Sequence, residues 1–273
     1  MAVICIAREM AALGEETVRE LSKATGYRPI DKEFLENRMT ELGIKPETRI
    51  KYDEKKPGFW ASLSQDRDDY LHFLSCVIYE EIAKGDCIIS GRGGFALLDG
   101  VPGVLAIKLV APLKLRIERI REQFSCDERH ALQLIRQSDH DRKGFHDYFF
   151  NVNWCDPSNY HLIINTGKQD PKSISELVHK LCLINITKDV EKAHKERIDQ
   201  LVLARNVLTE ILYKHHLPLH FLEADVSNGI VSLHGVANTQ AAIEAASAAA
   251  AAVPGIAKVV NSIQIVQEFA VMP

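Results

Sequence analysis

Five short apolar runs, separated by helix-type sequence, constrain the fold of this chain most strongly. Each run has the length and residue types of a β-strand. The runs are residues 3–7, 27–30, 87–90, 104–110 and 161–165. Strands that alternate with helices form a parallel sheet with helices on both of its faces. The pattern therefore predicts an α/β fold built on a five-stranded parallel sheet.

The segments between these runs carry apolar residues at three- and four-residue spacing, which is the period of an amphipathic helix. We expect helices at residues 15–25, 32–42, 68–84, 113–123, 127–137 and 173–183. Residues 43–67 contain Pro46, Pro57 and Gly58 among mixed charges, so we expect a partly ordered excursion between two helices there. Segments that cover a substrate are often built in this way.

A second unit follows the first, because the pattern changes after residue 183 and a polar stretch at 187–197 leads into new sequence. We place the boundary near residue 188, which gives domains of 1–187 and 188–273. The elements expected in the second domain are a helix at 196–215, strands at 219–226 and 230–234, a helix at 239–252 and a strand at 257–266. Asn228-Gly229 predicts a tight hairpin, since both turn positions accept positive φ. The second domain is therefore expected to be of α+β type.

Composition and charge exclude several classes of protein. Hydrophobic residues make up 46% and charged residues 26% of the chain, which is typical of globular proteins and not of disordered or collagen-like ones. The net charge of −4 is spread along the chain, whereas nucleic-acid binding needs a concentrated basic surface. The longest apolar stretches are of strand length, so we expect no signal peptide and no membrane span. Six scattered cysteines predict no metal site and a reducing, cytoplasmic location.

The first predicted strand leads into a helix at a glycine, where α/β nucleotide-binding proteins hold phosphates with free backbone N–H groups. The connecting sequence is Glu9-Met-Ala-Ala-Leu-Gly-Glu-Glu16. A full phosphate loop has several glycines, then a lysine and a Ser or Thr. This segment has one glycine, no lysine and two carboxylates at the helix start. Taken alone, it favours an ordinary helix with acidic residues in its first turn.

Other segments of the first domain point to phosphate chemistry. Residues 89–95 read Ile-Ser-Gly-Arg-Gly-Gly-Phe at the end of a predicted strand, where open α/β sheets bind ligands. Arg116 and Arg119 lie three apart on one predicted helix face. Arginines on a movable segment neutralise the charge that develops during phosphoryl transfer. Two alternatives stay open: Arg92 could pair with a local carboxylate, and Arg116 and Arg119 could belong to a solvated helix face.

Several segments, in this order, resemble the cytidylate kinase-like family over residues 1–183. They are residues 27–35 (Tyr-Arg-Pro-Ile-Asp-Lys-Glu-Phe-Leu), the turn at 91–93, and residues 111–120, 138–148 and 153–166. The resemblance implies a P-loop kinase fold of the nucleoside monophosphate kinase type, with a monophosphate-binding excursion and an arginine-bearing lid. It also implies ATP and Mg²⁺ as cofactors of an active enzyme.

The resemblance assigns roles to residues by their position. The nucleotide-binding candidates that it implies are Gly14, Glu15, Asp31, Arg92 and Asp139. The catalytic candidates are the arginines of the lid: Arg116, Arg119 and Arg142. In these roles Gly14 would lie in the phosphate loop, and Arg92 would approach the acceptor nucleotide.

Residues 11–16 depart from the family pattern. Relatives resemble Gly-Ser-Gly-Gly-Arg-Glu there, whereas this chain has Ala11 and Leu13 for glycines and Glu15 for a cation. A carboxylate about 4 Å from a phosphate oxygen costs about 4 kcal/mol at an effective dielectric of about 20. We therefore predict a nucleotide-binding protein, a pseudokinase, that transfers a phosphoryl group weakly or not at all. The alternative is an active CMP- or dCMP-type kinase that uses ATP and Mg²⁺.

Residues 229–266 resemble a BON domain. The matching positions are Gly229, Leu233, Gly235, Val236, Gly255, Val259, Val260 and Asn261. The resemblance implies binding to phospholipid surfaces, small ligands or proteins, and no catalysis. Residues 190–273 carry six Lys and Arg against eight Asp and Glu, a net charge of −2, which disfavours anionic membranes. We therefore expect a small ligand, a protein partner or a second copy of the chain here, and a regulatory role that responds to nucleotide.

Overall fold

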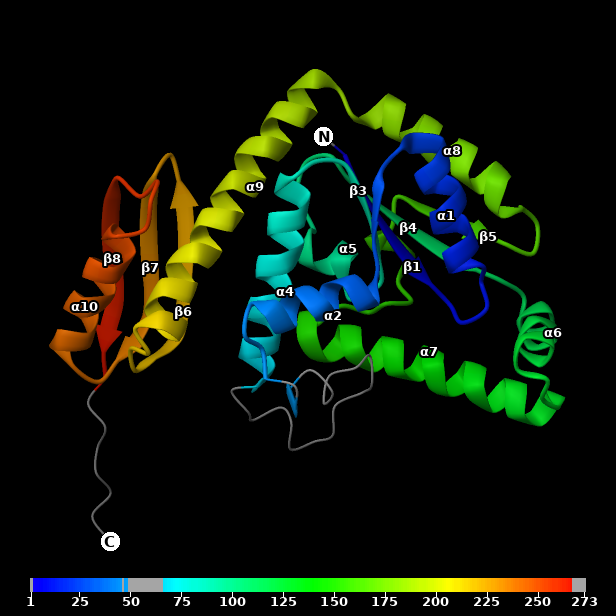
Figure 1. The fold of residues 1–273 in the computed structure, drawn as a ribbon, viewed down its shortest axis with the longest axis horizontal. Coiled ribbons are helices and arrows are strands. Elements are labelled where there is room, and N and C mark those ends of the chain that lie inside the picture. Colours follow the sequence, from blue (N-terminus) through cyan, green and yellow to red (C-terminus); the bar gives the residue numbers. More distant parts are fainter. Residues whose placement is uncertain (1, 46, 49–65, 267–273) are drawn as a thin grey trace, which may run out of the picture. The chain divides into compact units, whose positions relative to one another are not determined.

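The computed structural model describes residues 2–45, 47–48 and 66–266 (Figure 1). It divides into two compact units, Met1–Lys195 and Glu196–Pro273. Most of the excursion expected at residues 43–67 lies outside the described residues. None of the described helices combines the length and apolar character that crossing a membrane requires.

The first unit is built on a five-stranded parallel sheet, as the alternating pattern predicts. Its strands are β1 (Val3–Arg8), β2 (Arg28–Ile30), β3 (Cys87–Ser90), β4 (Val104–Val110) and β5 (Leu162–Asn165). They lie in the order β2-β3-β1-β4-β5, and every neighbouring pair is parallel. The first strand is therefore central, and the segment that follows it starts at the middle of the carboxyl edge of the sheet.

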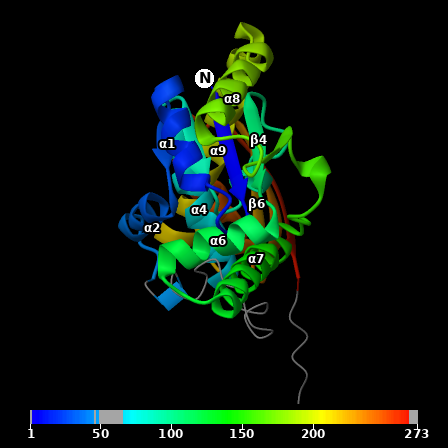
Figure 2. The ribbon, with the colours of Figure 1, turned by 90° about the vertical axis from the view of Figure 1, so that its right-hand side faces the viewer.

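Helices cover this sheet on both faces. They are α1 (Gly14–Thr25), α2 (Lys32–Glu41), α4 (Asp66–Ala83), α5 (Gly94–Leu97), α6 (Leu113–Phe124), α7 (Glu128–Phe150) and α8 (Pro171–Asn185). On one face, α1 and α8 bury Ile4, Ile6 and Ile107 of the strands. Figure 2 shows α6 and α7 below the end of β1, which is the edge that the segment after β1 occupies.

Helix α7 is longer than the helix predicted at residues 127–137. It continues through Gly144 to Phe150, so the segment at 138–148 belongs to the same helix. Phe145 and Phe149, one turn apart, pack against Tyr70 of α4 with ring centroids 6.3 and 4.9 Å away. This tertiary packing sustains the helix beyond the glycine, and local apolar spacing does not show it.

The second unit contains a three-stranded sheet, as expected for its α+β pattern. Its elements are α9 (Lys188–Leu208), which contains the division between the units, a π-helical turn (Thr209–Lys214), β6 (Leu219–Ser227), β7 (Ile230–Ala237), α10 (Gln240–Ala251) and β8 (Lys258–Ile265). Strand β7 pairs antiparallel with β6 and parallel with β8. Asn228 and Gly229 form the predicted turn with φ values of 50° and 74°. Ala246 and Ala250 of α10 are fully buried, so small side chains bring this helix close to the sheet.

Candidate functional site

The loop between β1 and α1 keeps a backbone shape that favours glycine. Ala11 and Leu13 have positive φ values of 60° and 54°. Side chains with a Cβ pay about 1–2 kcal/mol for this left-handed conformation. These two residues stand where the family pattern has glycines. The loop therefore holds a glycine-type bend with alanine and leucine in place of the glycines.

Gly14 is required where α1 begins. A Cβ at this position would lie 2.8 Å from Cγ of Arg8, which is closer than such atoms approach. Glycine therefore leaves room for the Arg8 side chain to cross the start of α1. The neighbouring Glu15 lies exposed in the first turn of the helix.

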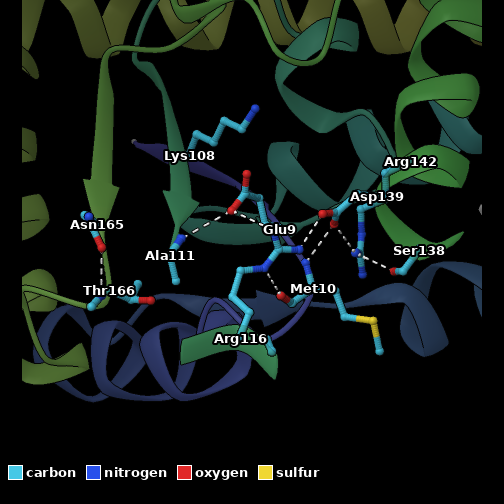
Figure 3. Close-up of polar contacts among 12 residues, drawn as sticks. Glu9, Met10, Lys108, Ala111, Arg116, Ser138, Asp139, Arg142, Asn165 and Thr166 are labelled. Atoms are coloured by element: carbon cyan, nitrogen blue, oxygen red, sulfur yellow. Dashed lines mark hydrogen bonds and ion pairs between the residues drawn. The ribbon is translucent and has the colours of Figure 1, made fainter. Parts of the chain in front are cut away.

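Arg116 of α6 ties the start of the loop to α7 (Figure 3). Its Nε donates to the carbonyl oxygen of Met10 at 2.7 Å, and its Nη1 donates to the Glu9 carboxylate at 3.2 Å. Its Nη2 forms an ion pair with Asp139. The Glu9 carboxylate also accepts the N–H of Ala111 at 3.2 Å. Since Arg116 is only 5% exposed, this network is largely shielded from water.

Arg119, one turn further along α6, also binds the loop. Its Nη1 donates to the Ala11 carbonyl oxygen at 2.8 Å and to Oγ1 of Thr166 at 3.1 Å. Its Nη2 donates to the Thr166 carbonyl oxygen at 2.9 Å. Burial lowers the pKa of its guanidinium. Arg116 and Arg119 therefore hold the loop, and the alternative of a solvated helix face is wrong.

The structure places Arg92 and Asp31 around α2. Arg92 has a positive φ of 51°, is 2% exposed and forms an ion pair with Glu36 of α2. Arg92 therefore has a carboxylate partner, but it lies on another element, 56 positions away in the chain, and is not the local carboxylate of the alternative. Asp31 caps α2, because its side chain accepts the N–H of Phe34 at 2.8 Å.

Two cavities share Arg8 and Arg142. The first, the arginine cavity, is lined by these two residues, by Arg92 and by apolar and aromatic side chains, and its free space of about 10 Å³ holds one water. The second, the loop cavity, measures about 730 Å³ and is lined by residues 8–16, by Arg142 and by α6 residues from Arg119 onward. Its size lies in the range of small-molecule sites, about 300–1,000 Å³.

Arg8 is the cation that the sequence reasoning missed. Within the described part of the chain, its guanidinium makes no hydrogen bond and no ion pair. By contrast, Arg142 donates to Oγ of Ser138 at 2.7 Å and lies 3.7 Å from the Asp139 carboxylate. A signal was present in the sequence, because a charged residue directly follows the buried run 3–7, at the edge of the sheet where ligands bind.

Charges of both signs line the loop cavity. Its cations are Arg8, Arg119 and Arg142, and its carboxylates are Glu9, Glu15, Glu16 and Glu122. Among residues 2–45, 47–48 and 66–266, no three His, Cys, Asp or Glu side chains are grouped as a metal site would need. The cavity can thus receive an anion at its guanidinium groups, while its carboxylates oppose one.

This arrangement, a parallel sheet with a phosphate-type loop at the end of its central strand, defines the P-loop kinase class of fold. The chain belongs to the cytidylate kinase-like family, whose pattern matches residues 3–168. Residues 199–267 match the BON domain. The resemblances stated from the sequence are confirmed for both parts.

Curated relatives match the chain over part of their length. A cytidylate kinase from Methanocaldococcus jannaschii is 32% identical over 101 residues, which are 36% of this chain and 57% of that protein. A uronate isomerase from Corynebacterium glutamicum is 32% identical over 101 residues, 37% of this chain and 19% of that protein. The chain therefore spans less than two thirds of either relative.

Among solved structures, an uncharacterized protein from Eubacterium ventriosum aligns with a TM-score of 0.55. It is 20% identical, and the alignment covers 67% of this chain and 98% of that one. At this identity the similarity concerns the fold.

Proposed function

We propose that residues 3–168 bind a nucleoside mono- or triphosphate in the loop cavity and transfer a phosphoryl group weakly or not at all. The observation that carries this proposal is Arg8. Arg8 lines both cavities at the end of the central strand, and its guanidinium has no anionic partner among the described residues. A partly buried cation without a counter-ion is suited to bind a phosphate, which would supply the missing negative charge.

The start of α1 supports phosphate binding at the same place. The backbone N–H groups of Gly14, Glu15 and Glu16 donate no hydrogen bond to a described residue, as expected for the first turn of a helix. These groups and the positive end of the helix dipole favour an anion. The left-handed bends at Ala11 and Leu13 bring the backbone into this position.

The carboxylates of the loop cavity support weak transfer. Glu15 occupies the position at which a full phosphate loop has its lysine and the family pattern has a cation, whereas Glu16 agrees with the family pattern. Both line the loop cavity, so they oppose the charge that develops on a transferred phosphoryl group. In this proposal Arg116 and Arg119 position the loop, while Arg8 and Arg142 face the ligand and Arg92 receives the acceptor after leaving Glu36.

The second candidate function is an active CMP- or dCMP-type kinase that uses ATP and Mg²⁺. The observation that favours it is the match of residues 3–168 to the cytidylate kinase-like family. Mg²⁺ binds carboxylate and phosphate oxygens together. The residues present fit such an ion, since Glu15 or Glu16 could ligate it beside the phosphates.

For residues 199–267 we propose a regulatory binding role, with a small ligand, a protein or a second copy of the chain as the partner. The net charge of −2 over residues 190–273 supports a partner other than an anionic membrane. We also propose a cytoplasmic location. All six cysteines are free, which suits a reducing compartment.

The test is a panel of CMP, dCMP, UMP and AMP with and without ATP and Mg²⁺, read by thermal shift and by turnover on the full chain. We expect a nucleotide to stabilise the protein without efficient turnover. Arg8→Gln should abolish this stabilisation, while Arg19→Gln, an exposed control on α1, should retain it. Rapid phosphorylation of one monophosphate would establish the active kinase instead. An Arg8→Gln variant that binds as wild type would remove Arg8 from the site.

A further inference from the structure

Lys108 is a charged residue in the interior of the parallel sheet. It lies in the middle of β4, in register with Ala7 of β1 and Ile163 of β5, and is 4% exposed. The other residues of β4 are all apolar. Burial lowers the pKa of its ammonium. A charged group in such surroundings is costly unless something compensates it.

The compensation within the described residues is incomplete. The Lys108 ammonium donates to the carbonyl oxygen of Trp154 at 2.8 Å. It also lies 4.1 Å from the centroid of the Trp154 ring and 5.3 Å from that of Tyr160. No described carboxylate lies within ion-pair distance of it. Figure 3 shows its side chain directed away from Arg116, which binds the nearby carboxylates of Glu9 and Asp139.

Trp154, whose carbonyl oxygen accepts the hydrogen bond of Lys108, also lines the arginine cavity. Trp154 lines this cavity together with His146 and Phe95. The His146 ring is stacked between the other two, at 6.2 Å from Trp154 and 5.1 Å from Phe95. These three residues form an aromatic wall. Lys108 therefore places a buried positive charge against Trp154, a residue that lines the cavity together with three arginines.

Resting on the proposed function, we propose that Lys108 is a positioning residue of the acceptor site: its buried charge favours an anionic acceptor group in the arginine cavity, and its hydrogen bond holds the Trp154 wall. The cavity is lined mainly by apolar groups, so solvent screens its charges little. Because its free space of about 10 Å³ holds only one water, an anionic group has to widen the cavity to enter it. The group would then lie among Arg8, Arg92 and Arg142, with the Lys108 ammonium against the Trp154 ring. The acceptor would thus supply a negative charge for Lys108 and Arg8, neither of which has an ion pair with a described carboxylate.

The effects of Lys108→Met on stability and on ligand binding distinguish the proposed role from a purely structural one. A methionine at this position would fit the apolar sheet, and replacing buried charge by apolar groups is often neutral or stabilising. Lys108→Met should therefore keep the melting temperature or raise it, and yet weaken ligand binding. Affinity should be lost for the monophosphate and not for the nucleoside, because Lys108 interacts with the charge of the phosphate group.

The experiment is calorimetric titration of the full chain with the monophosphate that wild type binds best, and with the matching nucleoside. In Lys108→Met we expect monophosphate affinity to fall about tenfold, and nucleoside affinity to stay within about twofold. Lys108→Arg should retain the monophosphate affinity, and Lys108→Gln, which keeps a donor without the charge, should lose it. Lys114→Met removes an exposed lysine on α6 and should behave as wild type.

The outcomes separate the two proposals. If wild type binds a monophosphate and Lys108→Met and Lys108→Gln bind it equally well, the role of Lys108 is wrong and the proposed function stands. Equal losses for monophosphate and nucleoside would also overturn the charge role, since they would indicate a displaced wall. If wild type binds no nucleotide, both proposals fail together.

Discussion

Arg116 and Asp139 both bind the backbone of Met10. Nε of Arg116 donates to the Met10 carbonyl oxygen at 2.7 Å, and Oδ1 of Asp139 accepts the Met10 N–H at 3.0 Å. The two side chains also form an ion pair with each other. The two peptide groups that flank Met10, near the start of the phosphate-type loop, are thereby attached to α7 and to α6. Side chains of α6 and α7 thus hold a loop that lacks the glycines and the lysine of a full phosphate loop.

This arrangement predicts a strong effect of Arg116 on stability. Arg116→Met should lower the free energy of unfolding by about 3 kcal/mol, because it removes the guanidinium that pairs with both Glu9 and Asp139. The double variant Arg116→Met/Asp139→Leu should cost less than the sum of its parts. Urea unfolding of the full chain measures both, and Arg121→Met, an exposed arginine on the same helix, is the control. Additive losses would show that the pair is not coupled.

The left-handed bend predicts the effect of restoring a glycine. Ala11→Gly should raise the free energy of unfolding by up to about 1 kcal/mol, since glycine adopts positive φ without strain. Ala12→Gly is the matched control, because Ala12 is buried and does not have a positive φ. That variant should be destabilised. Equal destabilisation of the two variants in urea would contradict the left-handed conformation at Ala11.

Reversing the charge of Glu15, at the start of α1, should strengthen the binding of a triphosphate. Glu15→Arg should raise triphosphate affinity in the absence of Mg²⁺ by about tenfold or more, because it replaces repulsion of the phosphates by attraction. The comparison variant is Glu20→Arg on the same helix, where Glu20 pairs with Lys23. Isothermal titration with ATP measures the difference. Equal affinity in the wild type and in Glu15→Arg would mean that Glu15 points away from the phosphates.

His194 predicts a dependence of stability on pH. It is fully buried at the start of α9, its Nδ1 lies 2.5 Å from the Pro102 carbonyl oxygen, and burial lowers its pKa. The unfolded chain, with a histidine pKa of about 6.5, therefore binds this proton more readily than the folded one. The free energy of unfolding should fall as the pH drops below about 6.5.

The measurement is urea unfolding between about pH 7.5 and 5.5. His194→Met should flatten the slope of stability against pH, whatever its effect at neutral pH. His140→Gln, which changes an exposed histidine on α7, should leave the slope as in wild type. A wild-type slope that persists in His194→Met would assign the titration to another group.

The elements of the fold could be predicted from local sequence. All five strands of the first unit and most of its helices follow the apolar spacing, whereas α5 and the part of α7 after residue 137 do not. The Asn228-Gly229 turn forms as its residue types require. The roles of single arginines could not be predicted in this way. Arg116 and Arg119 share a helix face that sequence alone could equally have left to solvent, yet both contact the loop.

The sequence by itself determined most of the secondary structure and its α/β and α+β arrangement, because strand and helix periods are properties of neighbouring residues. The site depends on contacts between residues far apart in the chain. Arg116 meets the Met10 carbonyl oxygen across 106 positions, and α7 extends past Gly144 because Phe145 and Phe149 pack on α4. Such contacts arise only when the sheet brings separate helices to one edge, and so folding in three dimensions decides which charges face a ligand.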